Sequence, residues 1–77
     1  MDEKIDTSEQ FIDFYIKKAS NLAEIAENHY KNKEYRKCLE LLNQAYSFYV
    51  KGNAKDLAEK IKLRFNEIKE TYFKKKD

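Results

Sequence analysis

The sequence predicts an all-α fold, a single three-helix bundle that takes up residues 1–77. Proline is absent and glycine occurs once, so the chain lacks the turn residues that a β-rich fold requires. Charged residues make up 39% of the chain, a mixture that suits helices. Apolar residues recur at helical spacing in three stretches, about residues 8–31, 34–51 and 54–73, and we expect residues 1–6 and 74–77 to be frayed.

The first predicted helix begins at a capping box, in which Thr7 and Gln10 satisfy backbone N–H groups of the first turn. Its apolar stripe is wider than one helix contact needs, so we expect this helix to touch two neighbours. The stripe consists of Phe11, Ile12, Tyr15, Ile16, Ala19, Leu22, Ala23, Ala26 and Tyr30. The pair Asn32 and Lys33 then interrupts the pattern, and we expect the asparagine to take the left-handed conformation that ends a helix.

The second predicted helix has the widest apolar arc, which indicates a central element or a face left for a partner. The arc consists of Tyr35, Cys38, Leu39, Leu41, Leu42, Ala45, Tyr46, Phe48, Tyr49 and Val50. Gly52 follows it, and we expect this glycine to supply a positive φ. Asn53, with Asp56 three residues later, is the predicted amino-terminal cap of the next helix.

The third predicted helix has a narrow apolar stripe, so we expect it to pack on the hairpin along one seam. The stripe consists of Ala54, Leu57, Ala58, Ile61, Phe65, Ile68 and Tyr72. Leu63 lies opposite this stripe and Phe73 lies beside it, and both stand among lysines. We therefore expect both side chains to be exposed.

Charge is distributed unevenly along the chain, although the net charge is only +2. Residues 1–13 hold five acidic residues and one lysine, a local charge of −4, whereas residues 60–76 hold seven basic and two acidic residues, a local charge of +5. The single Cys38 excludes an internal disulfide. With no apolar run resembling a signal peptide or a membrane span, we expect a cytoplasmic protein.

Residues that could support catalysis are few. His29 and Cys38 are the only soft metal ligands, and a metal site needs three or four. Cys38 lies on the apolar face of its helix, which favours an inert buried thiol. We therefore expect no enzymatic activity, no metal site and no cofactor.

Small and apolar residues of the first two helices fit a known pattern. Tyr35, Cys38, Leu42 and Ala45 match the second helix of a tetratricopeptide repeat, and the first helix matches through Leu22, Ile25 and Ala26. One repeat cannot bury its own apolar faces, so the third helix has the position of a cap. In size and helix order the whole chain resembles the MIT (microtubule interacting and trafficking) domain.

The resemblance to the MIT domain implies a module that binds short helical or extended motifs from ESCRT-III-like tails, in grooves beside the third helix. The chain departs from the repeat pattern at His29, where an aromatic residue is usual, and at Lys33, where a glycine is usual. It also has Tyr30 where MIT domains often have an acidic residue.

A partner surface is predicted where the second and third helices share a groove. We expect an apolar strip rimmed by cations, formed by Leu41, Phe48, Lys62, Leu63, Arg64, Lys69 and Phe73. The predicted function is therefore non-catalytic binding of a protein or peptide, or self-association in which the basic end meets the acidic end of another copy. The alternative is a small nucleic-acid-binding protein that uses the basic third helix.

Overall fold

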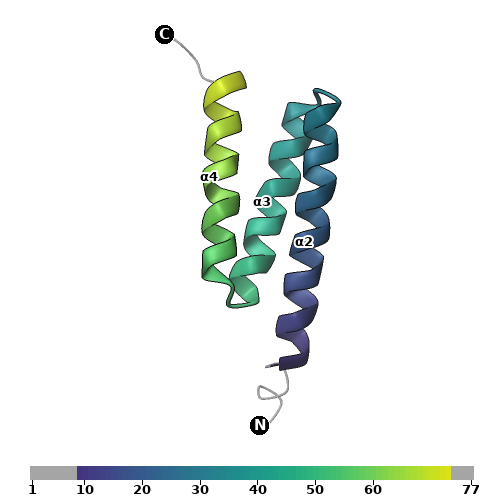
Figure 1. The fold of residues 1–77 in the computed structure, drawn as a ribbon, viewed down its shortest axis with the longest axis vertical. Helices are drawn as coiled ribbons and strands as arrows, with labels where there is room; N and C mark the ends of the chain where they lie inside the picture. Colours follow the sequence, from purple (N-terminus) through teal and green to yellow (C-terminus); the bar gives the residue numbers. More distant parts are fainter. Residues whose placement is uncertain (1–8, 74–77) are drawn as a thin grey trace.

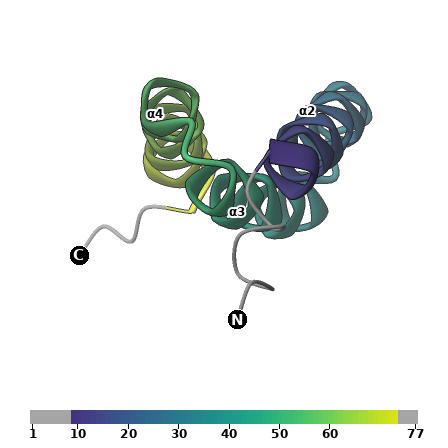
Figure 2. The same ribbon diagram turned by 90° about the horizontal axis from the view of Figure 1, so that it is seen from below.

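The computed structural model describes residues 9–73 and confirms the all-α fold (Figure 1). Its helices are α2 (Glu9–Lys31), α3 (Tyr35–Lys51) and α4 (Lys55–Tyr72). Successive helices run antiparallel, and Figure 2 shows α2 and α4 on the same side of α3. The predicted capping box at Thr7 and the predicted frayed ends, residues 1–6 and 74–77, lie outside the described residues.

The core is built around α3, which contributes Cys38, Leu42, Ala45 and Tyr49 to it. The other buried apolar side chains are Ala19 and Ala26 of α2, and Ala58 and Ile68 of α4. Alanines with no exposed surface lie where α2 crosses α3, and small side chains allow two helix backbones to approach closely. The wide apolar arc of the second predicted helix is thus explained by its central position.

The turn between α2 and α3 reverses the chain at Lys33, which has φ 65°. Here the sequence prediction was wrong, because it gave the left-handed conformation to Asn32. The N–H of Glu34 donates to the His29 carbonyl at 2.8 Å, and the N–H of Lys33 donates to the Tyr30 carbonyl at 2.9 Å. This pair of bonds is a Schellman motif, which requires positive φ one residue later than we predicted.

The turn between α3 and α4 repeats this geometry at Asn53, which has φ 63°. The N–H of Ala54 donates to the Tyr49 carbonyl at 2.9 Å, and the N–H of Asn53 donates to the Val50 carbonyl at 3.0 Å. Gly52 has φ −86°, so the prediction that it supplies the positive φ was wrong.

The amino-terminal cap of α4 also differs from the prediction. Ala54 occupies the cap position, and no side chain makes a capping hydrogen bond there. Asn53 is the left-handed residue of the preceding turn, one position too early to cap with Asp56 as we expected. The Schellman turn ends α3, and its two hydrogen bonds do not satisfy the N–H groups in the first turn of α4.

Gly52 is needed because the chain passes very close to α2. A Cβ atom at this position would lie 2.8 Å from Cγ1 of Ile16 and 3.3 Å from the carbonyl oxygen of Ile12. The α3–α4 turn is therefore pressed against α2 at these two residues. The first turn of α2 extends past this contact, as Figure 1 shows.

None of the helices within residues 9–73 is long and apolar enough to span a bilayer.

Candidate functional site

A groove runs between α3 and α4 on the side away from α2. Its central hollow has a volume of about 220 Å³. The lining residues are Leu42, Asn43, Tyr46, Ile61, Lys62, Phe65 and Asn66. Leu42 is fully buried, whereas Tyr46, Ile61 and Phe65 are half-buried and leave apolar surface open to the hollow.

The groove continues beyond this hollow in both directions. Toward the carboxyl end of α4 it is lined by Arg36, Leu39, Glu40, Asn43, Phe65 and Phe73. Toward the α3–α4 turn it opens onto the surface of α3 alone, where the lining residues are Asn43, Tyr46, Ser47, Val50 and Lys51. These three hollows together are called the α3–α4 groove below. From Arg36 to Val50 it follows α3 for about 21 Å, the rise of roughly 14 helical residues.

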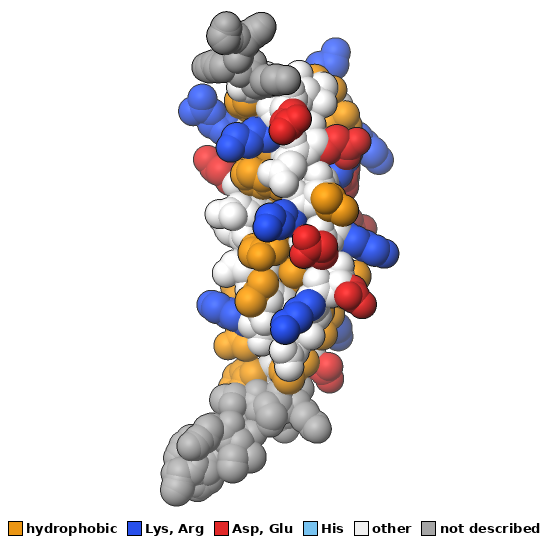
Figure 3. Space-filling view, turned by 90° about the vertical axis from the view of Figure 1, so that its left-hand side faces the viewer, with side chains coloured by type: hydrophobic (Ala, Val, Ile, Leu, Met, Phe, Trp, Pro, Cys, Tyr) orange, Lys and Arg blue, Asp and Glu red, His pale blue; other side chains and the backbone are white. Residues whose placement is uncertain are grey.

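The rim of the α3–α4 groove is mainly cationic. Arg36 lines it from α3, Lys62 lines it from α4, and Glu40 is the acidic residue among the lining side chains. Lys51 lines the end near the α3–α4 turn, but its ammonium lies 5.9 Å from the centre of the Tyr15 ring of α2. Lys69 follows Lys62 by seven positions, which places both lysines on the same face of α4. Figure 3, which looks onto α4, shows apolar side chains interleaved with charged ones along this helix.

Two amides complete the walls. Asn43 stands on α3 and Asn66 on α4, both are exposed, and both line the central hollow. A primary amide has two N–H donors and one acceptor, so it can bind a carboxylate as well as a peptide group. The groove thus combines an apolar floor with neutral donors and cations at its edge.

The opposite flank of α4 is occupied by an ion pair with α2. Arg64 donates from Nε and Nη2 to the two carboxylate oxygens of Glu27, at 2.9 Å and 2.8 Å. Its guanidinium carbon lies 4.6 Å from the centre of the Tyr30 ring. The hydrogen bonds to Glu27 raise the pKa of the Arg64 guanidinium above its ordinary value. The same bonds hold this side chain against α2, away from the groove.

Three tyrosines pack together on the same flank, at the carboxyl end of α4. The rings of Tyr35 and Tyr72 stack with centroids 3.8 Å apart, and the hydroxyls of Tyr30 and Tyr72 lie 3.3 Å apart. The hydrogen bond to Tyr72 raises the pKa of the Tyr30 hydroxyl. Because the rings come from all three helices, they hold α4 against the hairpin.

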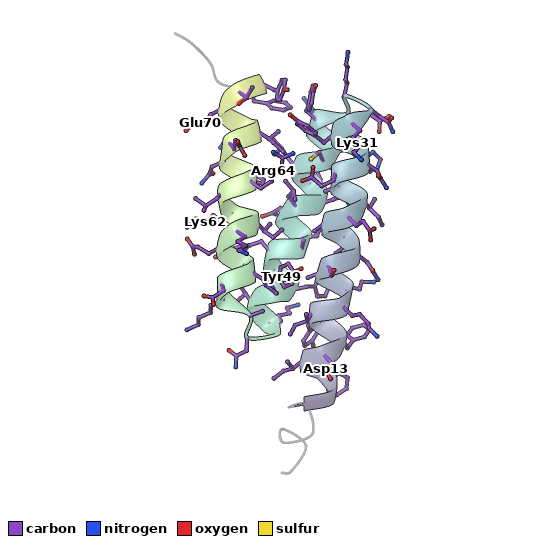
Figure 4. The ribbon with its side chains drawn as sticks, in the orientation of Figure 1. Asp13, Lys31, Tyr49, Lys62, Arg64 and Glu70 are labelled. Carbon is purple, nitrogen blue, oxygen red and sulfur yellow. The ribbon has the colours of Figure 1, made fainter. Side chains whose placement is uncertain are left out.

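The structure brings part of the predicted partner surface to the α3–α4 groove. Lys62 and Phe73 line it, and Lys69 shares the face of Lys62. Arg64 does not, because it turns toward α2, and Figure 4 shows Lys62 and Arg64 pointing in different directions. Leu63 is 63% exposed and lines no hollow of the groove.

Leu41 and Phe48 lie on the α2 side of α3. Leu41 packs against the buried cluster that contains Cys38, and Phe48 stacks on Tyr15 of α2 with ring centroids 5.9 Å apart. The single continuous strip that we predicted is therefore divided among different faces. The prediction treated a wide arc on α3 as one surface, whereas α2 and α4 cover its two edges.

Sequence reasoning missed the groove residues Asn43 and Asn66, because a polar residue on a helix carries no signal of what faces it. It also missed Glu27, the carboxylate that binds Arg64. Glu27 and Arg64 are 37 residues apart, so no local spacing indicates their pairing.

The remaining reactive side chains have ordinary environments. Cys38 has no exposed surface, and burial raises the pKa of its thiol. Nδ1 of His29 contacts a carboxylate oxygen of Glu34. Within the described part of the chain, no three His, Cys, Asp or Glu side chains gather where they could hold a metal ion.

No family model, no curated protein and no solved structure matches this chain.

Proposed function

We propose that the domain is a non-catalytic module that binds an acidic amphipathic helix in the α3–α4 groove. The observation that carries this proposal is the composition of the groove: half-buried apolar side chains form the floor, and cations and amides form the rim. Apolar anchors supply affinity in such sites, and complementary charge supplies orientation and association rate.

A helix is the favoured form of the ligand. A groove between two antiparallel helices accepts a further helix by the same packing that builds helical bundles. Its length along α3 suits about four turns. Carboxylates on the flanks of the bound helix would meet Lys62 and Arg36, and they would accept hydrogen bonds from Asn43 and Asn66.

The likeness to a tetratricopeptide hairpin capped by an MIT-like helix supports the same class of function. Ala26, Cys38 and Ala45 have no exposed surface, as the close crossing of such a hairpin requires. The groove also lies beside the third helix, where MIT domains bind their motifs. By this analogy, an ESCRT-III-like tail is the partner class to examine first.

A labelled peptide tests the proposal directly. The probe is a helix of about 15 residues with leucine along one face and glutamate on the others, and its control is a scramble in which the leucines share no face. Fluorescence anisotropy should show saturable binding of the probe and weaker binding of the scramble. Equal binding of the two peptides would contradict a groove with an apolar floor.

Two substitutions locate the binding site. Lys62→Glu should weaken probe binding about five- to tenfold, because it reverses a charge on the rim. Lys60→Glu is the matched control: it makes the same change on the same helix, about 200° around its axis. Asn66→Trp should block the central hollow and weaken binding further. If Lys60→Glu weakens binding as much as Lys62→Glu, the groove is not the site.

Salt separates this function from nucleic-acid binding. A phosphate-binding surface loses affinity steeply as salt rises, whereas an apolar groove retains much of its affinity. We expect the probe peptide to stay bound when salt is raised, and a single-stranded oligonucleotide to bind weakly throughout. Tight, salt-sensitive binding of the oligonucleotide with no binding of the peptide would favour the nucleic-acid alternative.

A further inference from the structure

The start of α2 exposes aromatic side chains beyond the bundle. Phe11 is 44% exposed and Phe14 is 53% exposed, and their spacing of three places them on one side of the helix. Tyr15 packs against both rings, at centroid distances of 6.5 Å and 5.7 Å. Large aromatic groups at this exposure are the usual anchors of a protein contact.

This aromatic end carries carboxylates that can meet the cations of the groove. Glu9 and Asp13 stand beside the two phenylalanines in the sequence, ahead of Lys17 and Lys18. The α3–α4 groove is rimmed by Arg36 and Lys62, and its floor is apolar. One molecule therefore contains both a helix start with exposed apolar anchors and two carboxylates, and a surface of the kind that receives such a helix.

The two surfaces cannot meet within one copy of the structure. Gly52 has no Cβ atom, so the α3–α4 turn lies directly against Ile12 and Ile16. This contact packs the start of α2 on the bundle. The groove opens on the side of α3 and α4 away from α2. The start of α2 can thus enter the groove only of another molecule.

The geometry points to a second copy of this chain as an occupant of the α3–α4 groove, with Phe11 and Phe14 of one copy docked in the groove of the next. This inference rests on the proposed function, because it uses the same groove. The donor and acceptor surfaces differ, so the contact is heterologous, and association proceeds head to tail into rings or open chains rather than stopping at a two-fold dimer.

Sedimentation of complementary variants tests this arrangement. The wild-type chain should show a mass that rises with concentration up to about 1 mM. Phe11→Asp with Phe14→Asp removes the donor end, and Lys62→Glu with Asn66→Trp blocks the groove. Each double variant should be monomeric alone, and their equimolar mixture should form a dimer and nothing larger, because only one intact donor–groove pair exists. Circular dichroism confirms that both variants are folded.

Ile25→Asp is the matched control for the donor end. Ile25 lies on α2 with the same 44% exposure as Phe11, but far from its start. This variant should associate as the wild type does. If it abolishes association, or if the groove variant alone still self-associates, the donor or the acceptor surface has been assigned wrongly and the inference fails.

The outcomes separate this inference from the function on which it rests. A wild-type chain that stays monomeric at about 1 mM, while the acidic probe peptide still binds, overturns self-association and leaves the peptide-binding function standing. A monomeric chain that also fails to bind the probe overturns both. A mixture of the two double variants that stays monomeric, although wild type associates, shows an interface other than this one.

Discussion

The two flanks of α4 are built from similar residues and do different things. The flank toward α2 pairs Arg64 with Glu27 and stacks Tyr72 on Tyr35, so its polar groups are used within the fold. The flank toward the α3–α4 groove presents Lys62 and Asn66 to an open hollow. A cation on this helix therefore stabilises the fold or stays available to a ligand according to its angle around the axis.

The two cations that behave so differently are only two positions apart in the sequence. Lys62 and Arg64 are separated by about 200° around the axis of α4, so α2 covers Arg64 and leaves Lys62 open. Arginine also suits the covered position, because its planar fork can engage both carboxylate oxygens at once. Comparison of these two side chains shows that the charge of a helix does not indicate its binding face.

The largest expected effect on stability concerns the buried face of α4, which lies between its two flanks. Ile68 is 1% exposed and packs in the cluster with Ala26, Cys38 and Leu42, so Ile68→Ala should lower the free energy of unfolding by about 2–5 kcal/mol. Leu63→Ala, on the same helix at 63% exposure, should change it by less than about 0.5 kcal/mol. Urea denaturation measures both. Equal losses would mean that α4 packs by a different face.

A smaller effect distinguishes the two cations. Arg64→Met removes two hydrogen bonds to a half-buried carboxylate and should cost about 1–2 kcal/mol, after allowance for solvent exposure of the pair. Lys62→Met should leave stability within about 0.5 kcal/mol, because the side chain lines the open groove. Thermal unfolding of the two variants decides the matter: a stability loss of the same size at Lys62 would erase the distinction between the flanks.

Alkaline pH should destabilise the buried cluster that contains Cys38 and Ile68. Burial raises the pKa of this thiol above 9.0, so its contribution to stability is complete below about pH 9 and is lost as pH rises through the folded-state pKa. Cys38→Ala should therefore reduce the fall in the free energy of unfolding between about pH 9 and pH 10.5. An unchanged pH profile would show that the thiol ionises as freely in the folded chain as in the unfolded one.

The smallest expected effects concern the two turns that set the helices beside each other. Lys33 and Asn53 both have positive φ, which costs lysine more than asparagine. Lys33→Gly should raise the free energy of unfolding by roughly 0.5–1 kcal/mol, and Asn53→Gly by less. Chemical denaturation checks the order. A stabilising effect confined to Asn53→Gly would mean that the two turns are strained differently from what their similar φ values indicate.

The fold class was predictable because it depends on local signals. Apolar spacing indicates three helices, and the helix ends from Lys31 to Tyr72 differ from the predicted ones by a residue at most. The turns were less predictable, because Gly52 and Asn32 have the residue types of a left-handed position while Asn53 and Lys33 take it. Hydrogen bonds across each turn determine which residue takes the positive φ. The glycine at position 52 is required instead by the close contact of the turn with α2.

The candidate site was predictable only in part. Lys62 and Phe73 were expected on a groove beside α4, and they line it. Arg64 has the same charge and nearly the same position in the sequence, yet Glu27 binds it from 37 residues away. Contacts between residues so far apart in sequence follow from the angle of each helix about its axis, which a pattern of apolar residues gives only approximately.

Side-chain NMR signals from α3 and α4 test the central claim most directly, because both flanks of α4 can be followed in one titration with the acidic probe peptide. The amide signals of Asn43 and Asn66 should shift and saturate, since both line the central hollow. The Nε–H signal of Arg64, hydrogen-bonded to Glu27 at 2.9 Å, should stay in place. A shift of the Arg64 signal with unmoved asparagine amides would contradict the account, because it would put the ligand on the flank that we assign to stability.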